Sequence, residues 1–188
     1  MAKGDTFFLR TTITSSGTDY VSDNIDISAY TDPARGRVLV VDKAFITFSN
    51  DGQGPIVPAD ITAASTTATK NLSRAIGAQA CSEKQTALVE LKDNSLFARC
   101  NLYASAVVAE VAAGAFGDPY IAQLSQTDAL NPGEYVGGFI VPTDAIHVGL
   151  DTTGAWAGEI DVGFMFEVHT EKLSLQRIQE LLVSLTAN

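Results

Sequence analysis

Residues 160–168 read Ile-Asp-Val-Gly-Phe-Met-Phe-Glu-Val, and this stretch shows most clearly which kind of fold the chain adopts. Every second residue is a large apolar one, whereas the residues between them are mostly small or charged. Successive side chains of a β-strand point to opposite faces, so a period of two predicts a strand with one face on a core. Because this is the longest such alternation, we expect a central strand. The side chains expected in the core are those of Ile160, Val162, Phe164, Phe166 and Val168.

The N-terminal part of the chain repeats this signal. Residues 7–13 alternate with the same period, and residues 20–27 can form a second, shorter strand. Residues 37–49 contain two apolar runs that are separated by Asp42 and Lys43. This pattern fits either one long strand with a bulge or two strands joined by a tight turn, and the sequence leaves both open.

The middle of the chain has weaker patterns. In residues 60–80, the apolar Leu72, Ala75 and Ile76 have a helical spacing that Gly77 could end, so we expect a short helix or an exposed loop. Alternating or apolar segments at 86–91, 96–111, 120–124, 135–141 and 146–150 predict further strands, and residues 112–119 predict a loop.

The period changes at Ser174, which is a suitable helix N-cap. After it, large aliphatic residues recur at helical spacing and predict one amphipathic helix of about three turns. We therefore divide the chain into a β-sandwich of residues 1–173 and a helix of residues 174–188. The stripe either covers one end of its own sandwich or contacts a neighbouring subunit, because exposed aliphatic side chains favour association. We expect a subunit interface at Leu175, Ile178, Leu181, Leu182 and Leu185.

Taken together, the elements predict an all-β fold. About eight strands at intervals of roughly 10 to 20 residues, with Gly, Pro and Asp between them, are typical of a sandwich or barrel. We favour a single jelly-roll β-sandwich of about eight antiparallel strands with a short C-terminal amphipathic helix.

Composition and charge exclude several classes of function. Hydrophobic residues make up 46% of the 188 residues and charged residues 18%, which is typical of neither a disordered chain nor a membrane protein. The formal net charge is −10, and the 12 basic residues are spread along the sequence. Phosphate backbones would therefore be repelled, so we expect no direct contact with nucleic acid. No apolar stretch is long enough for a signal peptide core or a membrane-spanning helix, so we expect synthesis inside a cell.

We find no pattern of residues that indicates catalysis, a metal or a cofactor. Cys81 and Cys100 lack the further ligands of a zinc site, so we expect two buried free thiols. His147 and His169 are expected on the outward sides of their strands, as solvated or interface residues. No Gly-x-Ser-x-Gly nucleophile elbow is present. The Asp-containing loops at 50–52 and 151–154 lack the spacing of a calcium loop and fit ordinary turns. We therefore expect a protein that is not an enzyme.

The whole pattern resembles the single jelly-roll capsid proteins of tailless icosahedral viruses. The resemblance rests on the strand at 7–13, the region 142–168 with its long final strand, and the tail at 173–185. It implies a structural coat subunit that self-assembles into an icosahedral shell through side contacts of the sandwich and through its terminal segments. It further implies a location in the virion after synthesis in the host cytoplasm, with homo-oligomers and other virion structural proteins as partners. The chain has no basic arm, which fits a shell lined by another protein or by an internal membrane.

Two alternatives remain at this stage. A carbohydrate-binding or adhesin-type sandwich would use aromatic side chains on one rim, and Trp156, Tyr120 and Tyr135 are the candidates. A cupin-like enzyme would need clustered histidines as metal ligands, and the sequence has only two histidines.

Overall fold

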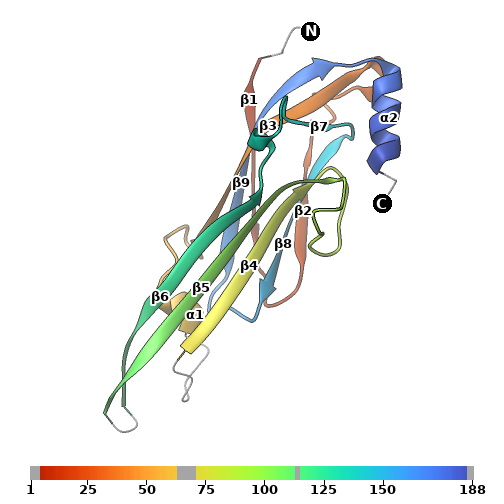
Figure 1. Ribbon diagram of the computed structural model, residues 1–188. Helices are drawn as coiled ribbons and strands as arrows, with labels where there is room; N and C mark the ends of the chain where they lie inside the picture. Colours follow the sequence, from red (N-terminus) through yellow and green to blue (C-terminus); the bar gives the residue numbers. More distant parts are fainter. Residues whose placement is uncertain (1–4, 63–70, 113–114, 186–188) are drawn as a thin grey trace.

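The computed structural model describes residues 5–62, 71–112 and 115–185. Two antiparallel sheets face each other, and a short helix lies at one end of the sandwich they form (Figure 1). None of the helices in these ranges is long and apolar enough to cross a bilayer. The elements in chain order are β1 (Phe7–Thr14), β2 (Val21–Asp26), the 3-10 turn η1 (Pro33–Arg35), β3 (Arg37–Asn50), α1 (Pro58–Thr62), β4 (Asn71–Cys81), β5 (Leu96–Ala112), β6 (Ala115–Leu130), the 3-10 turn η2 (Pro132–Glu134), β7 (Phe139–Val141), β8 (Ala145–Thr153), β9 (Ile160–Lys172) and α2 (Leu175–Leu185).

The strand order identifies the fold as a jelly roll. One sheet has the order β1-β9-β3-β7 and the other has the order β2-β8-β4-β5-β6. If β6 is set aside as an addition at one edge, β1 pairs with β9, β2 with β8, β3 with β7 and β4 with β5, and successive pairs lie in alternate sheets. This wrapping of one long hairpin into two facing sheets is the jelly-roll arrangement. The predicted all-β sandwich with a C-terminal helix is confirmed.

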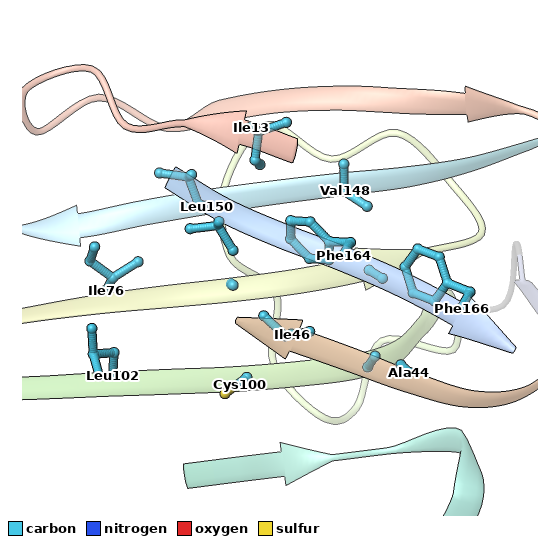
Figure 2. Close-up of a cluster of buried hydrophobic side chains, with 14 of the residues drawn as sticks. Ile13, Ala44, Ile46, Ile76, Cys100, Leu102, Val148, Leu150, Phe164 and Phe166 are labelled. Carbon is cyan, nitrogen blue, oxygen red and sulfur yellow. The ribbon is translucent and has the colours of Figure 1, made fainter. Parts of the chain in front are cut away.

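The core lies between the two sheets, and β9 supplies its centre. The side chains of Ile160, Val162, Phe166 and Val168 have no exposed surface, and that of Phe164 is 2% exposed. Figure 2 shows the two phenylalanines among Ile76, Val148 and Leu150 of the facing sheet. β9 pairs with β1 on one side and with β3 on the other, so it is central in its sheet as predicted.

Two predictions from periodicity are corrected by the pairing of strands. Residues 71–81, where Leu72, Ala75 and Ile76 suggested a helix, form β4. This strand has β8 on one side and β5 on the other, and hydrogen bonding along both edges overrides the local spacing. Residues 86–91, which were predicted as a strand, lie in the irregular connection between β4 and β5. The buried Gln79 side chain bonds this connection, since its amide donates to the Ala87 carbonyl at 2.8 Å and accepts from the backbone N–H of Val89 at 2.8 Å.

The predicted loop at 112–119 is also corrected, because β6 already begins at Ala115 and pairs with β5 in a long hairpin. The predicted strand at 135–141 is shortened to Phe139–Val141. Gly137 and Gly138 have φ angles of 87° and 73°, which do not occur in a strand. A Cβ atom on Gly138 would lie 2.5 Å from the Val41 carbonyl oxygen, so close approach of two backbones requires glycine there.

The long strand β3 and the helix α2 agree with the sequence. Residues Arg37–Asn50 form one strand with a register shift between Val41 and Lys43, so the bulge is the correct one of the two alternatives. In α2 the Ser174 hydroxyl accepts a hydrogen bond from the backbone N–H of Arg177 at 3.3 Å, as expected of an N-cap.

Candidate functional site

Large apolar side chains are exposed on separate parts of the sandwich surface. On the outer face of the first sheet, Phe8 is 49% and Phe45 is 43% exposed, and we call this region the sheet face. On the outer face of the second sheet, Tyr103 of β5 is 49% exposed. At the end that carries α2, which we call the helix end, the exposed side chains are those of Leu91, Tyr135, Val136, Leu175, Leu182 and Val183.

The sheet face is built by the alternation of β1, β9 and β3. Inward residues of these strands form the core, so the residues between them must point outward. The register places Phe8 beside Glu167 and Glu167 beside Lys43, and the Lys43 ammonium lies 3.4 Å from the Glu167 carboxylate. The next outward row contains Arg10, whose guanidinium carbon lies 5.7 Å from the centre of the Phe8 ring. The face therefore combines aromatic rings with positive charge in a chain that is strongly acidic overall.

The helix end contains an apolar groove. It has a volume of about 400 Å³ and lies between α2, the segment from η2 to β7, and the connection before β5. The Asn94 side-chain amide donates to the Ser184 carbonyl at 2.8 Å and thereby joins this connection to α2. The apolar side chains that line the groove are those of Leu91, Leu96, Tyr135, Phe139, Ile140, Pro142, Leu181 and Leu185.

The residues predicted to form a subunit interface divide into two groups. Ile178 is 3% and Leu185 is 6% exposed, so the chain's own sandwich already covers them. Leu181 is half-buried in the wall of the groove. Leu175 and Leu182 remain 54% and 38% exposed and are available to a neighbour.

His169 was expected to be solvated or at an interface, and the structure corrects this expectation. The side chain is 3% exposed, with its Nδ1 atom 2.6 Å from the Asp42 carboxylate and its Nε2 atom 3.6 Å from that of Glu171. Val38 and Val40 on one face and Leu39 and Val41 on the other have no exposed surface, so both faces of this end of β3 are covered. The bulge at Asp42 places its carboxylate beside His169. Sequence alternation alone does not show which residue lies at the bulge.

His147 lines a small polar cavity on the other sheet. The cavity has a volume of about 140 Å³ and lies between β2, β8, β4 and the connection that follows β4. Burial, and then the nearby Lys84 ammonium, lower the pKa of His147. The buried Gln79 amide in the same wall donates to the Tyr20 hydroxyl at 3.0 Å, so this polar group already has partners.

The remaining predicted residues do not converge on a site. Trp156 precedes β9 and lines a cavity with Ser15 and Gly17, whereas Tyr135 lies at the helix end, beyond the other end of β9. These two aromatics therefore lie at opposite ends of the sandwich and do not form one rim. The side chain of Tyr120 lies outside the described residues.

The two cysteine thiols are buried as predicted, and a residue of one predicted loop lies in a strand. Burial raises the pKa of the Cys81 and Cys100 thiols to about 12, and both thiols are free. Asp151, expected in a loop, belongs to β8. Within the described ranges, no three histidine, cysteine or acidic side chains are placed to hold a metal ion.

Comparison with known proteins gives only distant likenesses. No protein-family profile matches the chain, and neither does any curated protein sequence. The VP1 pentamer of Human Polyomavirus 6 is 11% identical, with a TM-score of 0.41 over 92% of this chain and 97% of that one. VP1 of the Trichodysplasia spinulosa-associated polyomavirus, in complex with GM1 oligosaccharide, is 7% identical, with a TM-score of 0.44 over 89% of this chain and 96% of that one. The Desmodium yellow mottle tymovirus structure is 9% identical, with a TM-score of 0.31 over 91% and 85% of the two chains.

All three of these structures come from viruses. Because every TM-score is below 0.5, we base the fold on the strand order of the chain itself.

Proposed function

We propose that the chain is a viral capsid subunit that self-assembles into an icosahedral shell through side contacts of the sandwich and through its terminal helix. The observation that carries this proposal is the exposure of large apolar side chains on the sheet face and at the helix end of one small sandwich. A monomeric protein seldom exposes more than one large apolar patch, whereas a subunit of a closed shell must contact several neighbours.

The energetics of the exposed aromatics favour association. Phe8 and Phe45 are each about half exposed, and full burial of such a side chain contributes roughly 1.5 to 3 kcal/mol. Covering the remaining half of each ring would therefore contribute about 1 kcal/mol per ring and per contact. Contacts of this size are weak singly, but they add when each copy has several neighbours.

The same proposal covers the partners and the location. A second copy of the chain is the main partner, other structural proteins of the virion are further partners, and the assembled protein resides in the virion. The acidic chain is not assigned a direct contact with nucleic acid, and on the sheet face the Lys43 ammonium is already paired with Glu167. We assign no catalytic role and no cofactor.

Assembly can be tested with the purified protein. A concentration series measured by light scattering and negative-stain microscopy is expected to show closed particles above a critical concentration. The double variant Phe8→Ser with Phe45→Ser should raise that concentration while costing only about 2 kcal/mol in monomer stability, or roughly 4 to 8 °C in melting temperature, because both side chains already contact water. The double variant Thr12→Ser with Thr47→Ser changes the same strands on the same face and is the matched control. A parent protein that stays monomeric at high concentration would contradict the proposal.

A further inference from the structure

Residues on the two lateral edges of the first sheet lie at the same position along the strand direction. Phe8 at one edge lies opposite Glu167, and Glu167 lies opposite Lys43. The turn η2 packs directly beside Lys43, since a Cβ atom on Gly133 would lie 3.4 Å from the Lys43 Cγ atom. Asn131 holds the turn in place, because its side-chain amide donates to the Ala44 carbonyl at 2.7 Å. One row of residues therefore crosses the sheet from Phe8 to η2 at a single height along the strands.

The β1 edge presents an unprotected strand. Among the described residues β1 pairs only with β9, so its other side has no strand partner. Exposed strand edges are commonly protected by charged residues, as the edge strand β2 is by Asp23 and Asp26. By contrast, β1 contains a single charged residue, Arg10. In the described part of the chain Arg10 forms no ion pair, and its guanidinium lies over the Phe8 ring in a cation–π contact.

The η2 edge presents the complementary chemistry. Glu134 is exposed and has no ion-pair partner in residues 5–62, 71–112 and 115–185. It is followed by Tyr135 and Val136, which are 38% and 107% exposed. Two backbone hydrogen bonds form the turn: the Tyr135 N–H donates to the Pro132 carbonyl at 3.0 Å, and the Gly138 N–H donates to the Tyr135 carbonyl at 3.3 Å. A preformed turn loses little conformational entropy when a partner covers it.

We propose that neighbouring copies of the chain pack side by side, with Phe8 and Arg10 of one copy against Glu134, Tyr135 and Val136 of the next. The two groups lie on opposite edges of one sheet at equal height, so rotation about an axis roughly parallel to the strands brings them together. Such a contact joins two different surfaces, and a rotation that closes repeats it around a ring, as a closed shell requires. The positive charge of Arg10 meets the negative charge of Glu134, and this complementarity selects the register of the contact. This inference rests on the proposed function, because it specifies one contact within the shell.

A charge exchange tests the contact. Arg10→Glu and Glu134→Arg should each raise the critical concentration for assembly by about tenfold, because each places like charges across the interface. The double variant that carries both changes should recover most of this loss. Arg10→Glu combined with Glu159→Arg has the same net charge as that double variant, but Glu159 is an exposed residue at the start of β9, so this combination should show no recovery.

Cross-linking supplies a second measurement. Phe8→Cys with Val136→Cys should form disulfides between copies on oxidation of assembled particles, whereas Phe8→Cys with Ala157→Cys should not. The native thiols do not compete, because they are buried with pKa values of about 12.

If particles form normally in every charge variant and no cross-link appears, the inference is overturned while the capsid function stands. If the parent protein does not assemble, both are overturned.

Discussion

Phe164→Ala should be among the most destabilising single substitutions in the chain. The Phe164 side chain is 2% exposed, and its ring is stacked with that of Phe166 at a centroid distance of 6.3 Å. Thr11 of β1 and Ile46 of β3 flank it in register, so paired backbones hold the strand on both sides. Phe164→Ala would leave a cavity, and the hydrogen bonds of β9 to β1 and β3 prevent the backbone from moving in to fill it. We therefore expect a loss of about 4 kcal/mol in the free energy of unfolding, within the usual range for Phe→Ala in a core. For a domain of this length that corresponds to a fall of roughly 8 to 16 °C in melting temperature.

The assay is urea and thermal unfolding followed by circular dichroism at a concentration at which light scattering shows monomers, because assembly would stabilise the folded state by mass action. Phe45→Ala is the matched control. It makes the same change on the neighbouring strand, but Phe45 points outward and is 43% exposed, so the loss should be about 1 kcal/mol. If Phe164→Ala melts within two or three degrees of the parent, or costs no more than Phe45→Ala, the placement of β9 at the centre of the core is wrong.

On α2, Ile178→Ala should lower the free energy of unfolding by about 2 to 4 kcal/mol, because the side chain is 3% exposed. Leu182→Ala should cost only about 1 kcal/mol and reduce assembly, because its side chain is 38% exposed. Calorimetry measures the loss of stability and light scattering the loss of assembly. Burial raises the pKa of the Cys81 and Cys100 thiols to about 12, so a thiol reagent at pH 8 should react with neither in the folded protein and with both in urea, as absorbance would show. The pKa of His147 is lowered from 6.5, so the unfolded chain binds a proton that the folded chain does not. Stability should therefore fall as the pH drops from 6.5 to the lower folded pKa, and His147→Gln should make unfolding less dependent on pH in that window. An identical pH profile for parent and variant would contradict this.

Local alternation was sufficient to locate strands whose two faces differ. Residues 160–168 alternate because one side of β9 contacts the core and the other carries Met165 and Glu167. The difference between the two faces can therefore be recognised from the residue types alone. The helix was equally predictable, because its aliphatic spacing and its cap at Ser174 are contained within a few turns. Where both faces of a strand are covered, as in the second half of β4, the alternation is lost, and the prediction of a helix or a loop there was wrong.

The surfaces that we propose for assembly were only partly predictable. The sequence identified the stripe of α2, but it did not show that Ile178 and Leu185 would pack within the chain while Leu182 stayed exposed. Nothing in the spacing of Phe8 and Phe45 showed that both would lie on the same outer face, on the two strands that flank β9. The outcome depends on which strand lies next to which.

By itself, the amino-acid sequence determined the class of the fold, the inward residues of β1 and β9, the C-terminal helix and the acidic charge of the whole chain, because each of these depends on the order of neighbouring residues. The sequence favoured a jelly roll over other sandwiches and barrels, and the strand order confirmed it. Only the tertiary structure decided that Asp42 and His169 meet and that Phe8 and the turn η2 lie at the same position along the strands on opposite edges of one sheet. The physical reason is that a period of two reads the same in every register that is shifted by two residues. Pairing between distant strands is selected by the sum of many weak contacts across the core, and those contacts exist only in the folded chain.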